Sequence, residues 1–92
     1  MGVILTGTLR CADADEAAHV RAALPEHIRL TRAEAGCVSF DVTPTGDPLI
    51  WDVAEEFTTP EAFNAHATRA AASDWAIQTK GITRDYKITG LP

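Results

Sequence analysis

Glu55 and His66 are two side chains capable of acid–base chemistry that stand where the sequence pattern favours apolar residues. Glu55 shares the alternation of Trp51 and Phe57 in an expected strand, and His66 follows Phe63 on the apolar stripe of the next expected helix. A buried carboxylate costs several kcal/mol unless it finds a partner. A carboxylate beside an imidazole stabilises the charged form of the imidazole and fixes the tautomer of its neutral form. The pattern therefore predicts an acid–base site between this strand and this helix.

The sequence offers more than one interpretation of Glu55. Arg84 stands in the apolar register of the last expected strand and is a second candidate partner. Glu55 also lies near the end of its strand, where a carboxylate can reach solvent, and a helical histidine beside an aromatic residue often forms the edge of a core. A purely structural role for Glu55 and His66 is therefore the alternative to a catalytic pair.

Local signals define the elements that would position these residues. Asp13 followed by Glu16, and Thr59-Pro60-Glu61, are typical helix starts, while Pro25 predicts a kink or restart and Gly36 a helix stop. The expected elements are a strand over 3–10, a helix from 13, strands over 37–43 and 49–57, a helix from 59, a short helix over 74–79 and a strand over 82–89. This order predicts an α+β, ferredoxin-like split βαβ fold with a four-stranded antiparallel sheet, as a single domain over residues 1–92.

Side-chain patterns divide the expected elements into faces. Val38, Phe40 and Val42 share one register of the second strand, and both helices are expected on one face of the sheet. The other face is mixed in character and would meet water or a second copy of the chain. His19 and His27 fall on or near exposed positions of the first helix. Most aromatic residues at such spacings form a core, but a pocket that retains some of them would suit a planar aromatic ligand.

Bulk properties exclude several classes of function. The 92 residues carry a formal net charge of −5 with no basic run, which disfavours nucleic-acid and membrane partners. The short apolar start resembles a strand more than a signal peptide, and Cys11 and Cys37 are too few for a disulfide framework, so a cytoplasmic location is expected. No metal site is predicted, because Glu55 and His66 are only two ligands. No organic-cofactor motif is present.

Three short segments, in order, resemble the antibiotic biosynthesis monooxygenase (ABM) family of the dimeric α+β barrel superfamily. Residues 32–42, RAEAGCVSFDV, are similar to the family's glutamate-glycine-cysteine approach to the second strand. Glu55-Glu56-Phe57 ends the third strand, where the family usually has tryptophan in place of Phe57. Residues 59–66 then match its helix and closing histidine.

The resemblance implies a homodimer paired through its sheets and an oxidoreductase that uses no cofactor. The expected reaction is oxidation of a small quinol or phenolic aromatic to a quinone with molecular oxygen. Glu55 and His66 match the family's positions, and we assign His66 as acid/base and Glu55 as its orienter. Arg84 is a candidate to stabilise an oxyanion. The expected substrate-binding wall is Trp51, Trp75, Phe40 and Tyr86.

Two other classes of function stay open beside the monooxygenase. An isomerase of small diketones would need several polar groups converging on the pocket and would work without oxygen. A non-catalytic dimer would leave Glu55 and His66 in a closed core with no cavity. Heme degradation, known in the superfamily, is disfavoured because the first strand carries Thr6 and Thr8 in place of asparagine and residues 71–79 contain no histidine.

Overall fold

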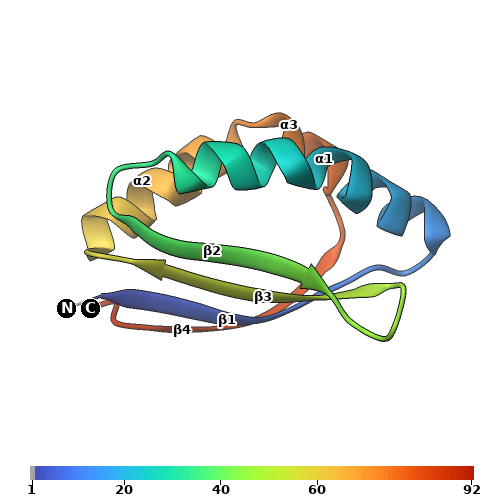
Figure 1. Ribbon diagram of the computed structural model, residues 1–92, viewed down its shortest axis with the longest axis horizontal. Coiled ribbons are helices and arrows are strands. Elements are labelled where there is room, and N and C mark those ends of the chain that lie inside the picture. Colours follow the sequence, from blue (N-terminus) through green and yellow to red (C-terminus); the bar gives the residue numbers. More distant parts are fainter. Residues whose placement is uncertain (1) are drawn as a thin grey trace.

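A four-stranded antiparallel sheet and a layer of helices on one of its faces make up the computed structural model, which describes residues 2–92 (Figure 1). The sheet order is β2-β3-β1-β4, which confirms the predicted α+β, ferredoxin-like fold. The strands are β1 (Val3–Arg10), β2 (Cys37–Pro44), β3 (Ile50–Phe57) and β4 (Thr83–Thr89), and the helices are α1 (Ala14–Arg32), α2 (Pro60–Ala71) and α3 (Asp74–Gln78).

The two long helices begin at the caps that the sequence predicts. Asp13 Oδ1 accepts a hydrogen bond from the Glu16 amide at 2.9 Å, and Thr59 Oγ1 accepts one from the Ala62 amide at 3.1 Å. The restart predicted at Pro25 is wrong, because α1 continues through it without interruption. Pro25 is exposed, so water can hydrogen-bond the carbonyl that the missing proline N–H leaves free.

The central strand β3 alternates as predicted. Trp51, Val53, Glu55 and Phe57 face the helices and are buried, whereas Asp52 and Ala54 on the other face are exposed. In β2 the predicted inward position of Val38 is wrong, and this side chain is 55% exposed. The reason is a register shift: Cys37 pairs with Phe57 and Ser39 with Glu56, so Val38 is an extra residue without a partner on β3.

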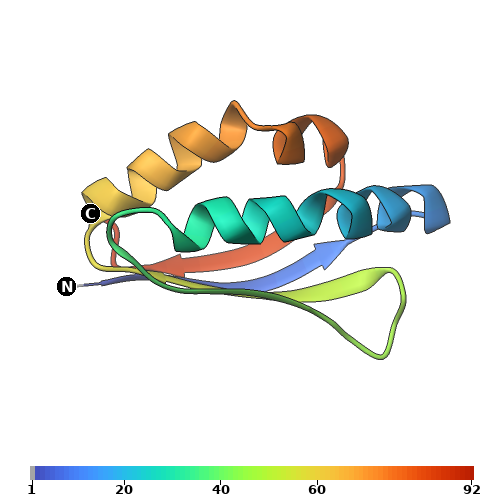
Figure 2. The same ribbon diagram turned by 45° about the horizontal axis from the view of Figure 1, so that its top comes forward.

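The helices cover the sheet unequally. Helix α1 contacts β2 and α3, while α2 contacts β3 and α3, so the helical layer has two halves side by side (Figure 2).

Gly36 lies in the connection from α1 to β2 at a φ of +86°, and a Cβ there would lie 2.5 Å from Ala62 Cβ. This glycine therefore lets the connection, which carries Glu34, approach α2 closely. None of the helices within residues 2–92 combines the length and the apolar character needed to cross a bilayer.

Candidate active site

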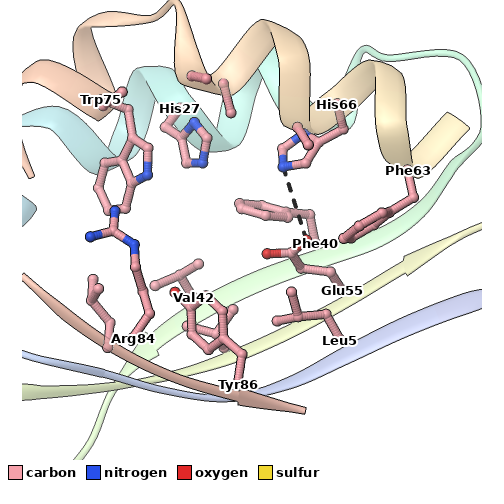
Figure 3. A pocket seen from close by; sticks show the side chains of 16 residues that line it. Leu5, His27, Phe40, Val42, Glu55, Phe63, His66, Trp75, Arg84 and Tyr86 are labelled. Carbon is pink, nitrogen blue, oxygen red and sulfur yellow. Dashed lines mark ion pairs between the residues drawn. The ribbon is translucent and has the colours of Figure 1, made fainter. Parts of the chain in front are cut away.

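A cavity of about 250 Å³ lies between the sheet and the helices, and both Glu55 and His66 line it (Figure 3). Its wall is mostly apolar and aromatic, with a few polar groups, as is usual for small-molecule sites. The lining side chains are Leu5, Leu9, His27, Phe40, Val42, Val53, Glu55, Phe63, His66, Ala67, Ala70, Ala71, Trp75, Ala76, Arg84 and Tyr86.

His66 lies between two carboxylates. Its Nδ1 is 2.7 Å from Glu34 Oε1, and its Nε2 is 3.9 Å from Glu55 Oε1 (Figure 3 marks the second contact). The structure thus brings Glu55 and His66 together across the cavity wall, but at a distance too long for a hydrogen bond. The hydrogen bond that orients the imidazole involves Glu34, to which the sequence analysis gave no role.

Glu34 is held as a carboxylate by its other partner, Arg69. Arg69 donates from Nε to Glu34 Oε2 at 2.8 Å and from Nη2 to Thr31 Oγ1 at 2.9 Å. Partial burial opposes ionisation of Glu34, but the hydrogen bonds from Arg69 and His66 outweigh it and lower the pKa of this carboxyl. Because an ionised carboxylate only accepts hydrogen bonds, His66 Nδ1 carries a proton. The lone pair of neutral His66 is then on Nε2, on the side of Glu55.

Glu55 has the opposite electrostatic environment. Only 8% of the residue is exposed, and no side chain among residues 2–92 donates a hydrogen bond to it. Burial, with a further contribution from the negative charge of Glu34, raises the pKa of Glu55 to about 7. The carboxyl group therefore exchanges protons near neutrality, in the range useful for acid–base chemistry.

The other predicted site residues are divided between the cavity and the core. Phe40, Trp75 and Tyr86 line the cavity, and burial raises the pKa of the Tyr86 phenol to about 12. Arg84 also lines it, with its guanidinium donating to the Thr79 carbonyl at 3.0 Å and the Thr79 hydroxyl at 2.8 Å. Trp51 does not line this cavity; it is buried in the apolar core and pairs with Leu9 between β3 and β1.

His27 is a cavity residue that the sequence analysis placed wrongly at the surface. It is only 5% exposed, and its ring stacks on Trp75 with centroids 4.6 Å apart and an interplanar angle of 2°. Burial, and then the charge of His66, lower the pKa of His27 to about 4. The signal that could have found it is the spacing of the buried positions of α1, which are Ala17, Val20, Ala23, Leu24, His27 and Thr31.

Metal ligands do not gather at this site. Within the described range 2–92, no group of three or more His, Cys, Asp or Glu side chains is placed to hold a metal ion. The polar groups that face the cavity are instead spread around an apolar wall. Such an arrangement can bind and deprotonate a small, mostly apolar molecule.

Comparisons with known proteins agree with this fold. SnoaB, a cofactor-independent oxygenase from Streptomyces nogalater, is 11% identical, with a TM-score of 0.79 over 99% of this chain and 93% of that one. A Nitrosomonas europaea protein that carries the ABM family name is 18% identical, with a TM-score of 0.81 over 98% of this chain and 89% of that one. Rv0793 from Mycobacterium tuberculosis is 24% identical, with a TM-score of 0.70 over 100% and 94%.

Sequence comparison decides the family. A search of curated proteins finds no match. The family model for antibiotic biosynthesis monooxygenase, however, matches residues 2–77, which include both carboxylates and His66. The chain therefore belongs to the antibiotic biosynthesis monooxygenase family.

Proposed function

We propose that this chain is a monooxygenase that oxidises a small phenolic aromatic of the quinol type to a quinone, using molecular oxygen and no cofactor. The observation that carries the proposal is the His66 imidazole, fixed at Nδ1 by Glu34 with its Nε2 on the side of Glu55 in an aromatic-lined cavity. The family membership supports a monooxygenase-type function. The shared fold with SnoaB, described as a cofactor-independent oxygenase, agrees with it.

In the proposed reaction the protein acts as a base and the substrate supplies the electrons. The phenol hydroxyl transfers its proton to His66 Nε2, which leaves an electron-rich phenolate. A ring carbon of the phenolate then bonds to one atom of oxygen. The O–O bond breaks as the ring carbon loses its hydrogen. The second oxygen atom leaves as water, which takes one proton from that ring carbon and the other from protonated His66. One phenol and one O₂ thus give one quinone and one water, with the ring oxidised and the oxygen reduced.

The two carboxylates have separate tasks in this mechanism. Glu34 orients His66 and fixes the tautomer that leaves Nε2 unprotonated, the role that the sequence analysis gave to Glu55. Glu55, 3.9 Å from Nε2, stabilises the imidazolium that forms when His66 takes the proton. Phe40, Trp75 and Tyr86 would hold the ring, and Arg84 would stabilise an oxyanion at the edge of the cavity.

The uncovered face of the sheet is the proposed site of homodimerisation. Ile4 on this face is 44% exposed, and Asp52 and Ala54 are exposed on the same face. Pairing of two sheets would cover this mixed surface and give the dimeric α+β barrel that the family resemblance implies. Light scattering tests this part separately: a particle of 9.9 kDa at micromolar concentration contradicts the dimer.

Oxygen uptake with a panel of substituted phenols and hydroquinones tests the activity. The parent protein should raise the rate above the protein-free rate for at least one member, and His66→Gln should lower that rate by at least 100-fold, the usual contribution of a general base. His19→Gln, an exposed histidine on α1, is the matched control and should leave the rate unchanged. If no phenol raises oxygen uptake, or if His66→Gln matches the parent, the proposal is wrong.

A diketone isomerase is the second candidate, because several polar side chains line the cavity. His27, Glu55, His66, Arg84 and Tyr86 all line it. Such an isomerase would convert its substrate equally well without oxygen. Product formation that is unchanged under anaerobic conditions would therefore favour the isomerase, and product formation that requires oxygen would exclude it.

A further inference from the structure

His27 is a buried polar side chain that the proposed mechanism does not use. Its Nδ1 has neither a hydrogen-bond partner nor exposure to solvent. Buried polar atoms nearly always have a partner, and an exception in a native protein calls for an explanation. His27 also lines the same cavity as His66, although it comes from α1 and His66 comes from α2.

Two aromatic side chains fix the plane of the His27 ring. Trp75 stacks on it at 4.6 Å, and Phe40 meets it edge to face, with centroids 5.3 Å apart and an interplanar angle of 86°. Figure 3 shows the ring of His27 pointing from the helical layer into the cavity, beside His66. The ring is therefore positioned by packing, and neither of its nitrogens forms a hydrogen bond within residues 2–92.

The environment of Nδ1 selects the tautomer of His27. An orphaned buried N–H is rarer than an under-satisfied acceptor, so the unpartnered Nδ1 is the unprotonated nitrogen. Nε2 then carries the proton of the neutral ring, and it is the nitrogen that can donate to a molecule in the cavity that His27 lines. His66 has the opposite tautomer, because its Nδ1 proton is held by Glu34. The cavity thus presents one imidazole donor and one imidazole acceptor, on rings whose centroids are 5.9 Å apart.

We propose that the Nε2–H of His27 donates a hydrogen bond to the same phenol oxygen that His66 deprotonates. The oxygen would accept from His27 while its own proton moves to His66 Nε2, and the His27 bond strengthens as the oxygen becomes negative. No bond to carbon changes in this step, which is a proton transfer alone. This inference rests on the proposed function in one respect, that the cavity receives a phenol.

His27 suits this role because it stays neutral. With a pKa of about 4, it neither takes the substrate proton nor changes charge near neutrality. The charged and titratable groups that also line the cavity are Glu55 from β3, His66 from α2, and Arg84 and Tyr86 from β4. Comparison of variants that differ only at His27 keeps these other groups constant.

A spectroscopic titration of bound 4-nitrophenol tests the proposal without any oxidation. Its phenolate absorbs visible light, so the pKa of the bound probe can be measured in the parent, in His27→Phe and in the control His19→Gln. His27→Phe keeps an aromatic ring against Trp75 but removes the donor. We expect the bound probe to be about tenfold harder to ionise in His27→Phe, a rise of about one pKa unit. His27→Gln, which restores an N–H, should recover part of the effect, and His19→Gln should behave as the parent.

Stability gives a second measurement that a purely structural histidine would fail. Replacing an unpartnered buried nitrogen by carbon should leave the urea midpoint of His27→Phe equal to or above that of the parent. His27→Met removes the donor with a flexible side chain and carries the same expectations for the probe and the midpoint, so it separates loss of the imidazole from overpacking by Phe. A lower midpoint in both variants, which would show that the fold depends on the imidazole, contradicts the proposal.

The outcomes separate this inference from the proposed function. A bound-probe pKa that is the same in His27→Phe and the parent, or a parent that does not bind the probe, overturns the role of His27. A parent whose bound-probe pKa depends on His27 but which never takes up oxygen retains this inference and removes the monooxygenase proposal. Oxygen uptake that is lost in His66→Gln but unchanged in His27→Phe removes only this inference.

Discussion

The layer between the sheet and the helices has two parts, which differ in how tightly they are packed and in whether their buried side chains are polar. The packed part consists of the apolar core side chains that lie outside the cavity, namely Cys11, Ala17, Val20, Leu24, Trp51 and Ile82. The hollow part surrounds the cavity of about 250 Å³ and holds the polar side chains His27, Glu55 and His66 among aromatic ones. Helix α1 contributes to both parts, with Ala17, Val20 and Leu24 in the packed part and His27 in the hollow part, whereas the other helical residues around the cavity come from α2 and α3.

The comparison indicates which part supplies stability and which supplies chemistry. In the packed part each apolar group removed from water stabilises the fold. In the hollow part, burial of two side chains opposes folding. Nδ1 of His27 is buried without a partner, and burial raises the pKa of Glu55. Residues that lower stability in this way are typical of functional sites. Substitutions should therefore have opposite effects in the two parts.

Trp51→Ala should give the largest change, because it removes a large side chain from the packed part. Trp51 is only 5% exposed, and its loss should lower the free energy of unfolding by about 3–5 kcal/mol in urea denaturation. Ile77→Ala, at a residue 73% exposed, is the control and should change it by less than about 0.5 kcal/mol. A loss below about 1 kcal/mol at Trp51 would show that this part is not tightly packed.

Glu55→Gln should act in the opposite direction, and its effect should depend on pH. The pKa of Glu55 is about 7 in the folded protein against an ordinary value of 4.5, so the folded state favours the protonated form. The stability from this group is therefore fully present below pH 4.5 and is lost as the pH rises through 7. Glu55→Gln removes this loss, and at pH 8 it should raise the free energy of unfolding by about 3 kcal/mol.

Urea unfolding at pH 4.5 and pH 8 measures this difference. Glu56→Gln, on the opposite face of β3, is the matched control and should show no comparable dependence on pH. An equal stability of the parent and Glu55→Gln at pH 8 would mean that water or another group stabilises the Glu55 carboxylate. Burial of Glu55 in the hollow part would then not lower the stability of the fold.

The fold could be predicted from the sequence because its signals are local. The Asp13 and Thr59 caps depend on residues three positions away, and the alternation of β3 depends on its own side chains. The position of Val38 could not be predicted, because a register shift is a property of the pairing between β2 and β3. Pro25 was misleading for a different reason: its effect depends on whether solvent reaches the free carbonyl.

The candidate site was predicted only in part, because it combines periodic and non-periodic positions. Glu55 and His66 stood out as polar residues within apolar patterns. Glu34 lies in a connection without periodicity, and its partners His66 and Arg69 are 32 and 35 residues away. His27 was placed at the surface, although it continues the spacing of Val20, Ala23 and Leu24 on α1. One residue is about 100° of helix rotation, so a shift of one position along the helix separates the buried stripe from an exposed one.

A matched pair of alanine substitutions tests the difference in packing itself, with the smallest expected effects. Ala17→Leu adds three carbons to the packed part, at a residue 2% exposed, and should lower the free energy of unfolding by about 1–3 kcal/mol through overpacking. Ala70→Leu adds the same carbons beside the cavity and should raise it by about 0.5–1 kcal/mol, because the new side chain fills open space. Urea denaturation of both variants gives the two signs directly. Ala70→Leu should also weaken the binding of 4-nitrophenol, whereas destabilisation by both substitutions would mean that the hollow part closes in solution and has no space for a ligand.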